Sequence, residues 1–138
     1  MALQLDNARK GRKVFVIDDD PGILELTTTL LTQAGCIVES CDNGYDGLEE
    51  LPKFKPEVLI LDLNMPGMDG FTVLDHMRRL GFHSAVRTLV FTARTNRDDV
   101  DRAVAMGARD YLSKPYEPKE LLLRVARLLI RDKSVLER

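Results

Sequence analysis

The sequence predicts an α/β domain with a parallel β-sheet that helices cover on both faces. Short apolar runs of strand type alternate with segments of helical periodicity, and five such runs are predicted strands, at residues 13–17, 37–40, 58–61, 88–91 and 110–112. The run at 58–61 is apolar throughout, which is typical of a central parallel strand. Right-handed crossovers between such strands give a doubly wound, five-stranded open sheet.

Helix start and stop signals fall between these strands. Asp20 is in position to cap a first helix over about residues 21–34, and Gly35 is suited to end it. A second helix is expected after Asn43, a third over about 71–80, a fourth after Asn96 and a last one near Pro118. Apolar residues at helical spacing in the second and fourth helices are Tyr45, Leu48, Leu51, Val100, Ala103 and Val104.

Composition excludes several classes of protein. The chain has 138 residues, 44% of them hydrophobic and 30% charged, as expected of one soluble globular domain. A net charge of -2 argues against nucleic-acid binding by this domain. The start carries no apolar run of signal-peptide length, and no run is long enough to span a membrane. Cys36 and Cys41 form neither a redox pair nor a zinc set, so a reducing cytoplasm is the expected location.

Polar residues follow four of the five strands, and in a parallel sheet they all fall at one edge. They are Asp18, Asp19 and Asp20 after the first strand, Asp62 after the third, Thr92 after the fourth, and Lys114 with Pro115 after the fifth. A single Asp after a strand is usually a turn or cap residue, and Asp20 is assigned that role. The other polar residues are hard to explain as helix caps, because they follow four different strands and fall at the same edge of the sheet.

The expected crowding of Asp18, Asp19 and Asp62 predicts a cation site. Two carboxylates about 4 Å apart repel by about 4 kcal/mol at an effective dielectric constant near 20. Oxygen ligands favour Mg²⁺, with Mn²⁺ as the alternative. Lys114 adds a second positive charge and Thr92 a hydroxyl donor. Phosphoryl transfer needs a nucleophile and charge neutralisation, so Asp62, which lies between these groups, is the expected acceptor of a phosphoryl group.

These residues resemble the receiver domain of bacterial two-component response regulators. The resemblance covers residues 13–131 and rests on Asp18-Asp19, the run from Asp62 to Gly70, Thr92-Ala93 and Lys114-Pro115. It leaves residues 1–12 as an N-terminal tail and 132–138 as a C-terminal tail or the start of a linker. It implies a flavodoxin-like (βα)5 fold with sheet order 2-1-3-4-5.

The resemblance also implies roles for individual residues. Mg²⁺ would be held by Asp19, Asp62 and the backbone carbonyl of Asn64, with Asp18 acting through water. Asp62 would accept the phosphoryl group of a sensor histidine kinase, a phosphotransfer protein or a small phosphodonor, without turnover of a separate substrate. Thr92 and Lys114 would bind the phosphoryl oxygens.

Further implied roles concern the switch. Tyr111 would move inward when the threonine is drawn to the phosphate, and the bond before Pro115 would be cis, which aims Lys114. Asn64 and Arg94 would tune the lifetime of the phosphorylated form.

The signal would pass to a downstream output domain or protein through the face of the fourth helix, fifth strand and fifth helix. Asp110, Glu120 and Arg124 match positions of a phosphorylation-dependent homodimer in the transcription-factor branch, whereas Val100 and Arg109 depart from its pattern.

Three other classes of protein share features of this sequence. A Mg²⁺-dependent phosphatase that works through an aspartyl phosphate would use the Asp18-to-Asp20 spacing, but Pro21-Gly22 follows where that family has glycine or a small hydroxyl residue. A flavodoxin would need a hydroxyl-rich phosphate loop where this chain has three aspartates. A phosphate-independent interaction module shares the fold, and the sequence alone does not separate it from the switch.

Overall fold

A computed structural model of the chain describes residues 4–93 and 96–129. Its five parallel strands lie in the order β2-β1-β3-β4-β5, which confirms the expected sheet. The strands and helices alternate along the chain as β1 (Lys13–Ile17), α1 (Pro21–Ala34), β2 (Ile37–Cys41), α2 (Gly44–Phe54), β3 (Val58–Asp62), α3 (Gly70–Leu80), β4 (Arg87–Ala93), α4 (Arg97–Ala105), β5 (Asp110–Lys114) and α5 (Pro118–Leu128).

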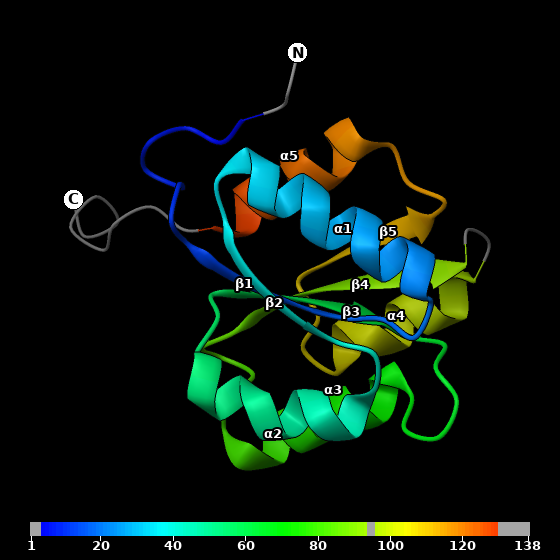
Figure 1. Cartoon of the computed structure of the whole chain (residues 1–138). Helices are drawn as coiled ribbons and strands as arrows, with labels where there is room; N and C mark the ends of the chain where they lie inside the picture. The colour runs from blue at the N-terminus through cyan, green and yellow to red at the C-terminus, as the bar shows by residue number, and fades with distance from the viewer. Residues whose placement is uncertain (1–3, 94–95, 130–138) are drawn as a thin grey trace.

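Helices cover both faces of the sheet. Helices α1 and α5 lie on one face, and α2, α3 and α4 lie on the other (Figure 1). Alternate residues of β1 point to the two faces: Val14 and Val16 pack under α1 and α5, whereas Phe15 and Ile17 pack under α2 and α3. Strand β3 is buried along its whole length, as its apolar run predicts.

Local sequence explains where the helices begin and end. The Asp20 side chain accepts hydrogen bonds from the backbone N–H groups of Gly22 and Ile23, at 2.9 and 3.2 Å, and so caps α1. Gly35 ends that helix in a left-handed conformation with φ of 112°. Two apolar residues at helical spacing are not in the core: Tyr45 on α2 is 65% exposed and Val104 on α4 is 51% exposed.

Residues 4–12, which we call the N-terminal strap, pack against the ends of α1 and α5. Leu5 is only 7% exposed and belongs to the core cluster on that face of the sheet. Its N–H donates to the carbonyl of Ala34, and the Arg9 guanidinium donates to the carbonyl of Ala126 at 2.6 Å. The strap therefore forms hydrogen bonds to carbonyls in the last turns of both helices.

Some residues named in the sequence analysis are not among those that the structure describes. Arg94, the last two residues of the expected domain at 130–131 and the segment 132–138 lie outside the described residues. Within the part of the chain that the structure describes, no helix combines the length and apolar character needed to cross a bilayer.

Candidate functional site

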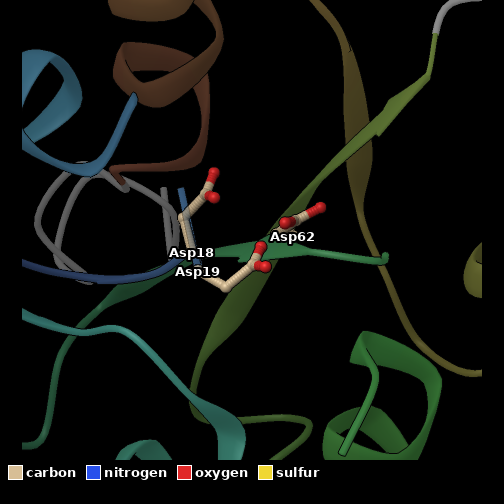
Figure 2. Close-up of side chains that lie close together, drawn as sticks. All are labelled: Asp18, Asp19 and Asp62. Carbon is tan, nitrogen blue, oxygen red and sulfur yellow. The ribbon is translucent and has the colours of Figure 1, made fainter. Parts of the chain in front are cut away.

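Three carboxylates meet at the carboxyl edge of the sheet (Figure 2). Asp18 and Asp19 follow β1, and Asp62 is the last residue of the neighbouring strand β3. Each offers an oxygen atom within 4.8 Å of the others. Asp18 is fully buried and Asp62 is 2% exposed, whereas Asp19 faces solvent. The parallel register produces this meeting, because it places the ends of β1 and β3 side by side.

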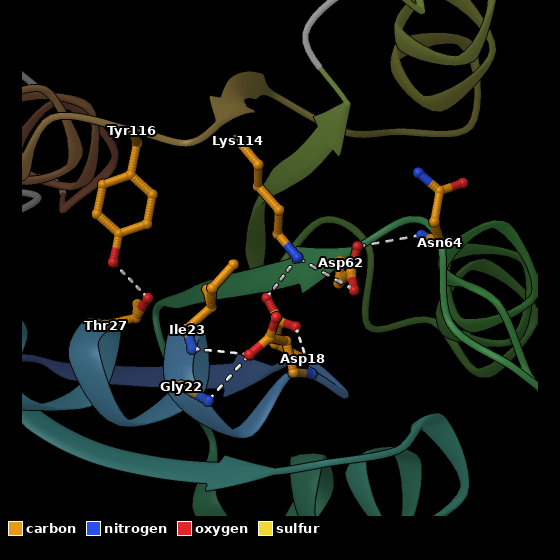
Figure 3. A network of polar contacts seen from close by, with 9 residues as sticks. Asp18, Gly22, Ile23, Thr27, Asp62, Asn64, Lys114 and Tyr116 are labelled. Atoms are coloured by element: carbon orange, nitrogen blue, oxygen red, sulfur yellow. Dashed lines mark hydrogen bonds and ion pairs between the residues drawn. The ribbon is translucent and has the colours of Figure 1, made fainter.

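Lys114 contacts both buried carboxylates. Its Nζ lies 2.9 Å from Asp18 Oδ2 and 3.3 Å from Asp62 Oδ2 (Figure 3). It is the last residue of β5, and the peptide bond between it and Pro115 is cis, the isomer that the resemblance implies. The ammonium group therefore lies between two acids that come from different strands.

Backbone N–H groups hold the other oxygen of each buried carboxylate. The N–H of Asp20 donates to Asp18 Oδ1 at 2.9 Å, and the N–H of Asn64 donates to Asp62 Oδ1 at 3.1 Å. Asp18 Oδ2 is also buried, and among the described residues its polar partner is the Lys114 ammonium group at 2.9 Å. Because a carboxylate oxygen has more than one lone-pair site, it can accept a further positive ligand beside Lys114.

The surroundings of Asp62 disfavour its charge. Burial, and then the negative charge of Asp18, raise the pKa of Asp62 from its ordinary value of 3.8 to about 7. Lys114 and the Asn64 N–H act in the opposite direction without cancelling these effects. Burial alone would lower the pKa of Lys114, but the two carboxylates outweigh it and the pKa is raised. A further cation near Asp62 would therefore favour its ionised form.

The predicted site residues are divided between two neighbouring hollows. An open depression is lined by Asp19, Asp62, Asn64 and Lys114, among others. Thr92 and Tyr111 line a separate cavity of about 430 Å³ against α4.

The two predicted site residues that line the second cavity differ in burial. Thr92 is 2% exposed, and its hydroxyl donates to the carbonyl of Ala93 at 3.3 Å. Tyr111 is 41% exposed. In the sheet, β4 with Thr92 lies between β3, which ends at Asp62, and β5, which carries Tyr111.

The residues expected at an interface contact one another within the chain. The Arg124 guanidinium lies 2.6 Å from Asp110 Oδ1 and 3.2 Å from Glu120 Oε1. It also lies 6.0 Å from the centre of the Tyr111 ring. In this structure the three side chains therefore form an internal cluster on β5 and α5.

Sequence reasoning missed one polar pair beside this site. The hydroxyl groups of Thr27 on α1 and Tyr116 after β5 lie 2.6 Å apart (Figure 3). The position of Tyr116 directly after Lys114-Pro115 was a signal, but nothing in the sequence pointed to Thr27 as its partner, because 89 positions separate the two residues.

Comparison with known proteins assigns the family. The sequence model of the response regulator receiver domain matches residues 14–126, and the chain belongs to this family. It is thus a receiver domain of the two-component response regulators, which are signalling proteins. The matched segment holds the three carboxylates, Thr92 and Lys114, and the N-terminal strap precedes it.

Individual relatives agree with this assignment. The chain is 35% identical over 123 residues to the DNA-binding response regulator MtrA of Mycolicibacterium smegmatis, a match that covers 89% of this chain and 53% of MtrA. The chemotaxis response regulator CheY4 of Vibrio cholerae superposes with a TM-score of 0.81 at 31% identity, over 87% of this chain and all of CheY4. The BeF3-activated DrrB receiver domain superposes with a TM-score of 0.76 at 28% identity, over 86% of this chain and 97% of DrrB's. This chain spans about half the length of the curated relatives it matches.

Proposed function

We propose that this chain is a phosphorylation-dependent switch in which Asp62 takes the phosphoryl group. The observation that carries the proposal is the position of Asp62. Its carboxylate is buried at the end of the central strand, lies 3.3 Å from the Lys114 ammonium and borders an open depression. Asp69, by contrast, caps α3 through its bond to the Thr72 N–H and has no such surroundings.

A divalent cation fits the acidic cluster. The three carboxylates offer oxygen ligands within 4.8 Å of one another, and Lys114 is the one cationic side chain in contact with Asp18 and Asp62 among the described residues. We assign Mg²⁺, or Mn²⁺ in its place, to Asp19, Asp62 and the backbone carbonyl of Asn64, with Asp18 acting through water. When bound, the cation supplies neutralising charge for the phosphoryl oxygens and the carboxylates.

The side chains of this protein then perform the transfer. One carboxylate oxygen of Asp62 attacks phosphorus and forms a P–O bond, while the bond from phosphorus to the donor nitrogen breaks. The donor nitrogen leaves with the bonding electron pair and takes up a proton. The Lys114 ammonium and the Thr92 hydroxyl donate to oxygens of the transferred group. Asn64 and Arg94 tune how long the acyl phosphate survives.

Phosphorylation is then transmitted by a change in contacts. The Thr92 hydroxyl bonds the Ala93 carbonyl at 3.3 Å, a long contact that a phosphoryl oxygen can replace. Tyr111 lines the same cavity as Thr92 and would move inward when the Thr92 hydroxyl turns to the phosphoryl group. Such a local change acts as a switch because it biases an element that has two arrangements.

The proposed partners follow from the family. A sensor histidine kinase or phosphotransfer protein donates the phosphoryl group in the cytoplasm, and an output domain or protein reads the face of α4, β5 and α5. The relatives that are named as DNA-binding support an output on DNA that lies outside this domain. A homodimer through Asp110, Glu120 and Arg124 would have to exchange their internal ion pairs for pairs between chains. No turnover of a separate substrate is proposed.

Intact-mass spectrometry after incubation with a small phosphodonor tests the proposal. Wild type should gain one phosphoryl group only with Mg²⁺ present, and Asp62→Asn should gain none. Asp98→Asn removes an exposed carboxylate outside the site and should be phosphorylated like wild type. If wild type gains no adduct and also fails to bind beryllofluoride, the phosphate-independent module replaces the switch.

A further inference from the structure

The loop between β5 and α5 is attached to the rest of the molecule by one side chain. Residues 115–117 follow Lys114 directly and lead into α5. Within segments 4–93 and 96–129, the bond between Tyr116 and Thr27 is the single hydrogen bond that joins this loop to an element other than α5. Thr27 is fully buried in the middle of α1 and offers a fixed partner.

Tyr116 and Lys114 also share one surface. The Tyr116 ring lies against Phe91 with the ring centres 5.3 Å apart, and the Lys114 Nζ lies 5.8 Å from the centre of the same ring. Phe91 is fully buried and precedes Thr92 on β4. Its ring therefore supports both side chains.

We propose that Tyr116 and Thr27 are positioning residues for Lys114. Their hydrogen bond holds the loop to α1, the helix that begins two residues after Asp19. In this way the backbone that carries Lys114 is held at a constant distance from the backbone that carries Asp18, and the 2.9 Å ion pair between them is kept. The role in phosphoryl transfer rests on the proposed function, whereas the positioning of the ammonium group does not.

Three substitutions separate the hydrogen bond from the packing around it. Tyr116→Phe keeps the ring on Phe91 and removes the hydroxyl. Thr27→Val keeps the side-chain shape and removes the partner hydroxyl. Thr27→Ser keeps a hydroxyl and loses only a methyl group, so it is the matched control for Thr27→Val. Each substitution replaces a side chain by one of similar or smaller size, so all three proteins are expected to fold.

The first readout is the NMR signal of the Lys114 ammonium protons in the metal-free protein. In wild type and Thr27→Ser, the ion pairs should slow the exchange of these protons with water. In Tyr116→Phe and Thr27→Val, exchange should be several-fold faster. A variant that was merely less stable, with Lys114 still in place, would keep the wild-type signal.

The second readout is the rate of phosphorylation by a small phosphodonor with Mg²⁺. Loss of one hydrogen bond should slow Tyr116→Phe and Thr27→Val by about threefold to tenfold. The double variant should be no slower than either single one, because the two hydroxyl groups act as a unit.

The outcomes distinguish the two proposals. Wild-type exchange and rates in both Tyr116→Phe and Thr27→Val would overturn the positioning role, as would a Thr27→Ser protein as impaired as Thr27→Val. If wild type itself is not phosphorylated, the proposed function fails, while the ammonium signal still decides the role of Tyr116 and Thr27.

Discussion

At the scale of single residues, Asp62 is the clearest case of a side chain held in an unfavourable state. The folded protein raises its pKa to about 7 through burial and the charge of Asp18, whereas the unfolded chain returns it to about 3.8. Between these two values the folded state binds the proton more tightly than the unfolded state does. The free energy of unfolding therefore falls as the pH rises through this window.

Asp62→Asn should remove this pH dependence. In metal-free solution the variant should match wild type near pH 5, where Asp62 is largely protonated in the folded protein. It should be more stable by about 2 kcal/mol at pH 8. Urea unfolding at a series of pH values measures the difference, with Asp98→Asn as the control that should follow wild type. A difference between Asp62→Asn and wild type that stays constant from pH 5 to 8 would contradict the assignment.

A second prediction at this scale concerns Gly70, the first residue of α3. A Cβ atom there would lie 2.6 Å from the backbone oxygen of Asp62 and 2.8 Å from the Cα of Leu63. Gly70→Ala should therefore lower the free energy of unfolding by about 1–3 kcal/mol and slow the phosphorylation of Asp62.

Gly22 provides the matched control for that substitution. It too lies in the first turn of a helix, but its Cβ would meet nothing closer than Asp20 Oδ1 at 3.4 Å. Gly22→Ala should change the free energy of unfolding by less than about 1 kcal/mol. Equal destabilisation by both substitutions would show that contact with the Asp62 backbone is not the cause.

At the scale of elements, caps and apolar runs were sufficient to predict every helix and strand to within a few residues. Helix α1 has its predicted bounds because Asp20 and Gly35 mark both ends. The strands extend further than predicted, since β3 includes Asp62 and β5 includes Lys114. A search for apolar runs stops at such polar residues, although they still pair with the neighbouring strand.

The N-terminal strap shows what the same signals miss. The resemblance leaves residues 1–12 as a tail, because the residues that carry it begin at residue 13. The structure nevertheless buries Leu5 in the core, and Arg9 bonds the last turn of α5. These contacts join residues far apart in the sequence, and only the folded chain reveals them.

Leu5→Ala tests how much the strap contributes. The substitution removes a side chain that is 93% buried and should lower the free energy of unfolding by about 2 kcal/mol. Leu80→Ala is the control, because Leu80 lies on α3, on the other face of the sheet, and is 59% exposed. It should change the free energy of unfolding by less than about 0.5 kcal/mol. Equal values for the two variants would mean that the strap adds no stability.

At the scale of the whole molecule, the site is a product of topology. A parallel sheet brings the ends of β1, β3, β4 and β5 to one edge, so the acidic cluster and Lys114 could be predicted to meet. Which atoms would pair could not be predicted. The ion pair of Lys114 with Asp18 as well as Asp62 depends on side-chain orientation and burial, for which sequence spacing carries no signal.

Ligand binding at this edge should stabilise the whole domain. Beryllofluoride with Mg²⁺, at a free concentration about 100 times the Kd, should raise the free energy of unfolding of wild type by about 2.7 kcal/mol. Asp62→Asn lacks the carboxylate that we propose as the acceptor, and it should gain nothing from beryllofluoride beyond the effect of Mg²⁺ alone. Urea unfolding with and without beryllofluoride measures this gain, and an equal gain in both proteins would place the binding site elsewhere.

The N-terminal strap has a mechanical consequence. It is held by side-chain contacts and a few hydrogen bonds at the ends of α1 and α5, whereas β1 behind it is bonded to strands on both sides. When the two ends of the domain are pulled apart, the strap should peel away bond by bond at low force, before the sheet bears the load. Stretching a single molecule should therefore show a short, reversible extension that precedes the rupture of the fold.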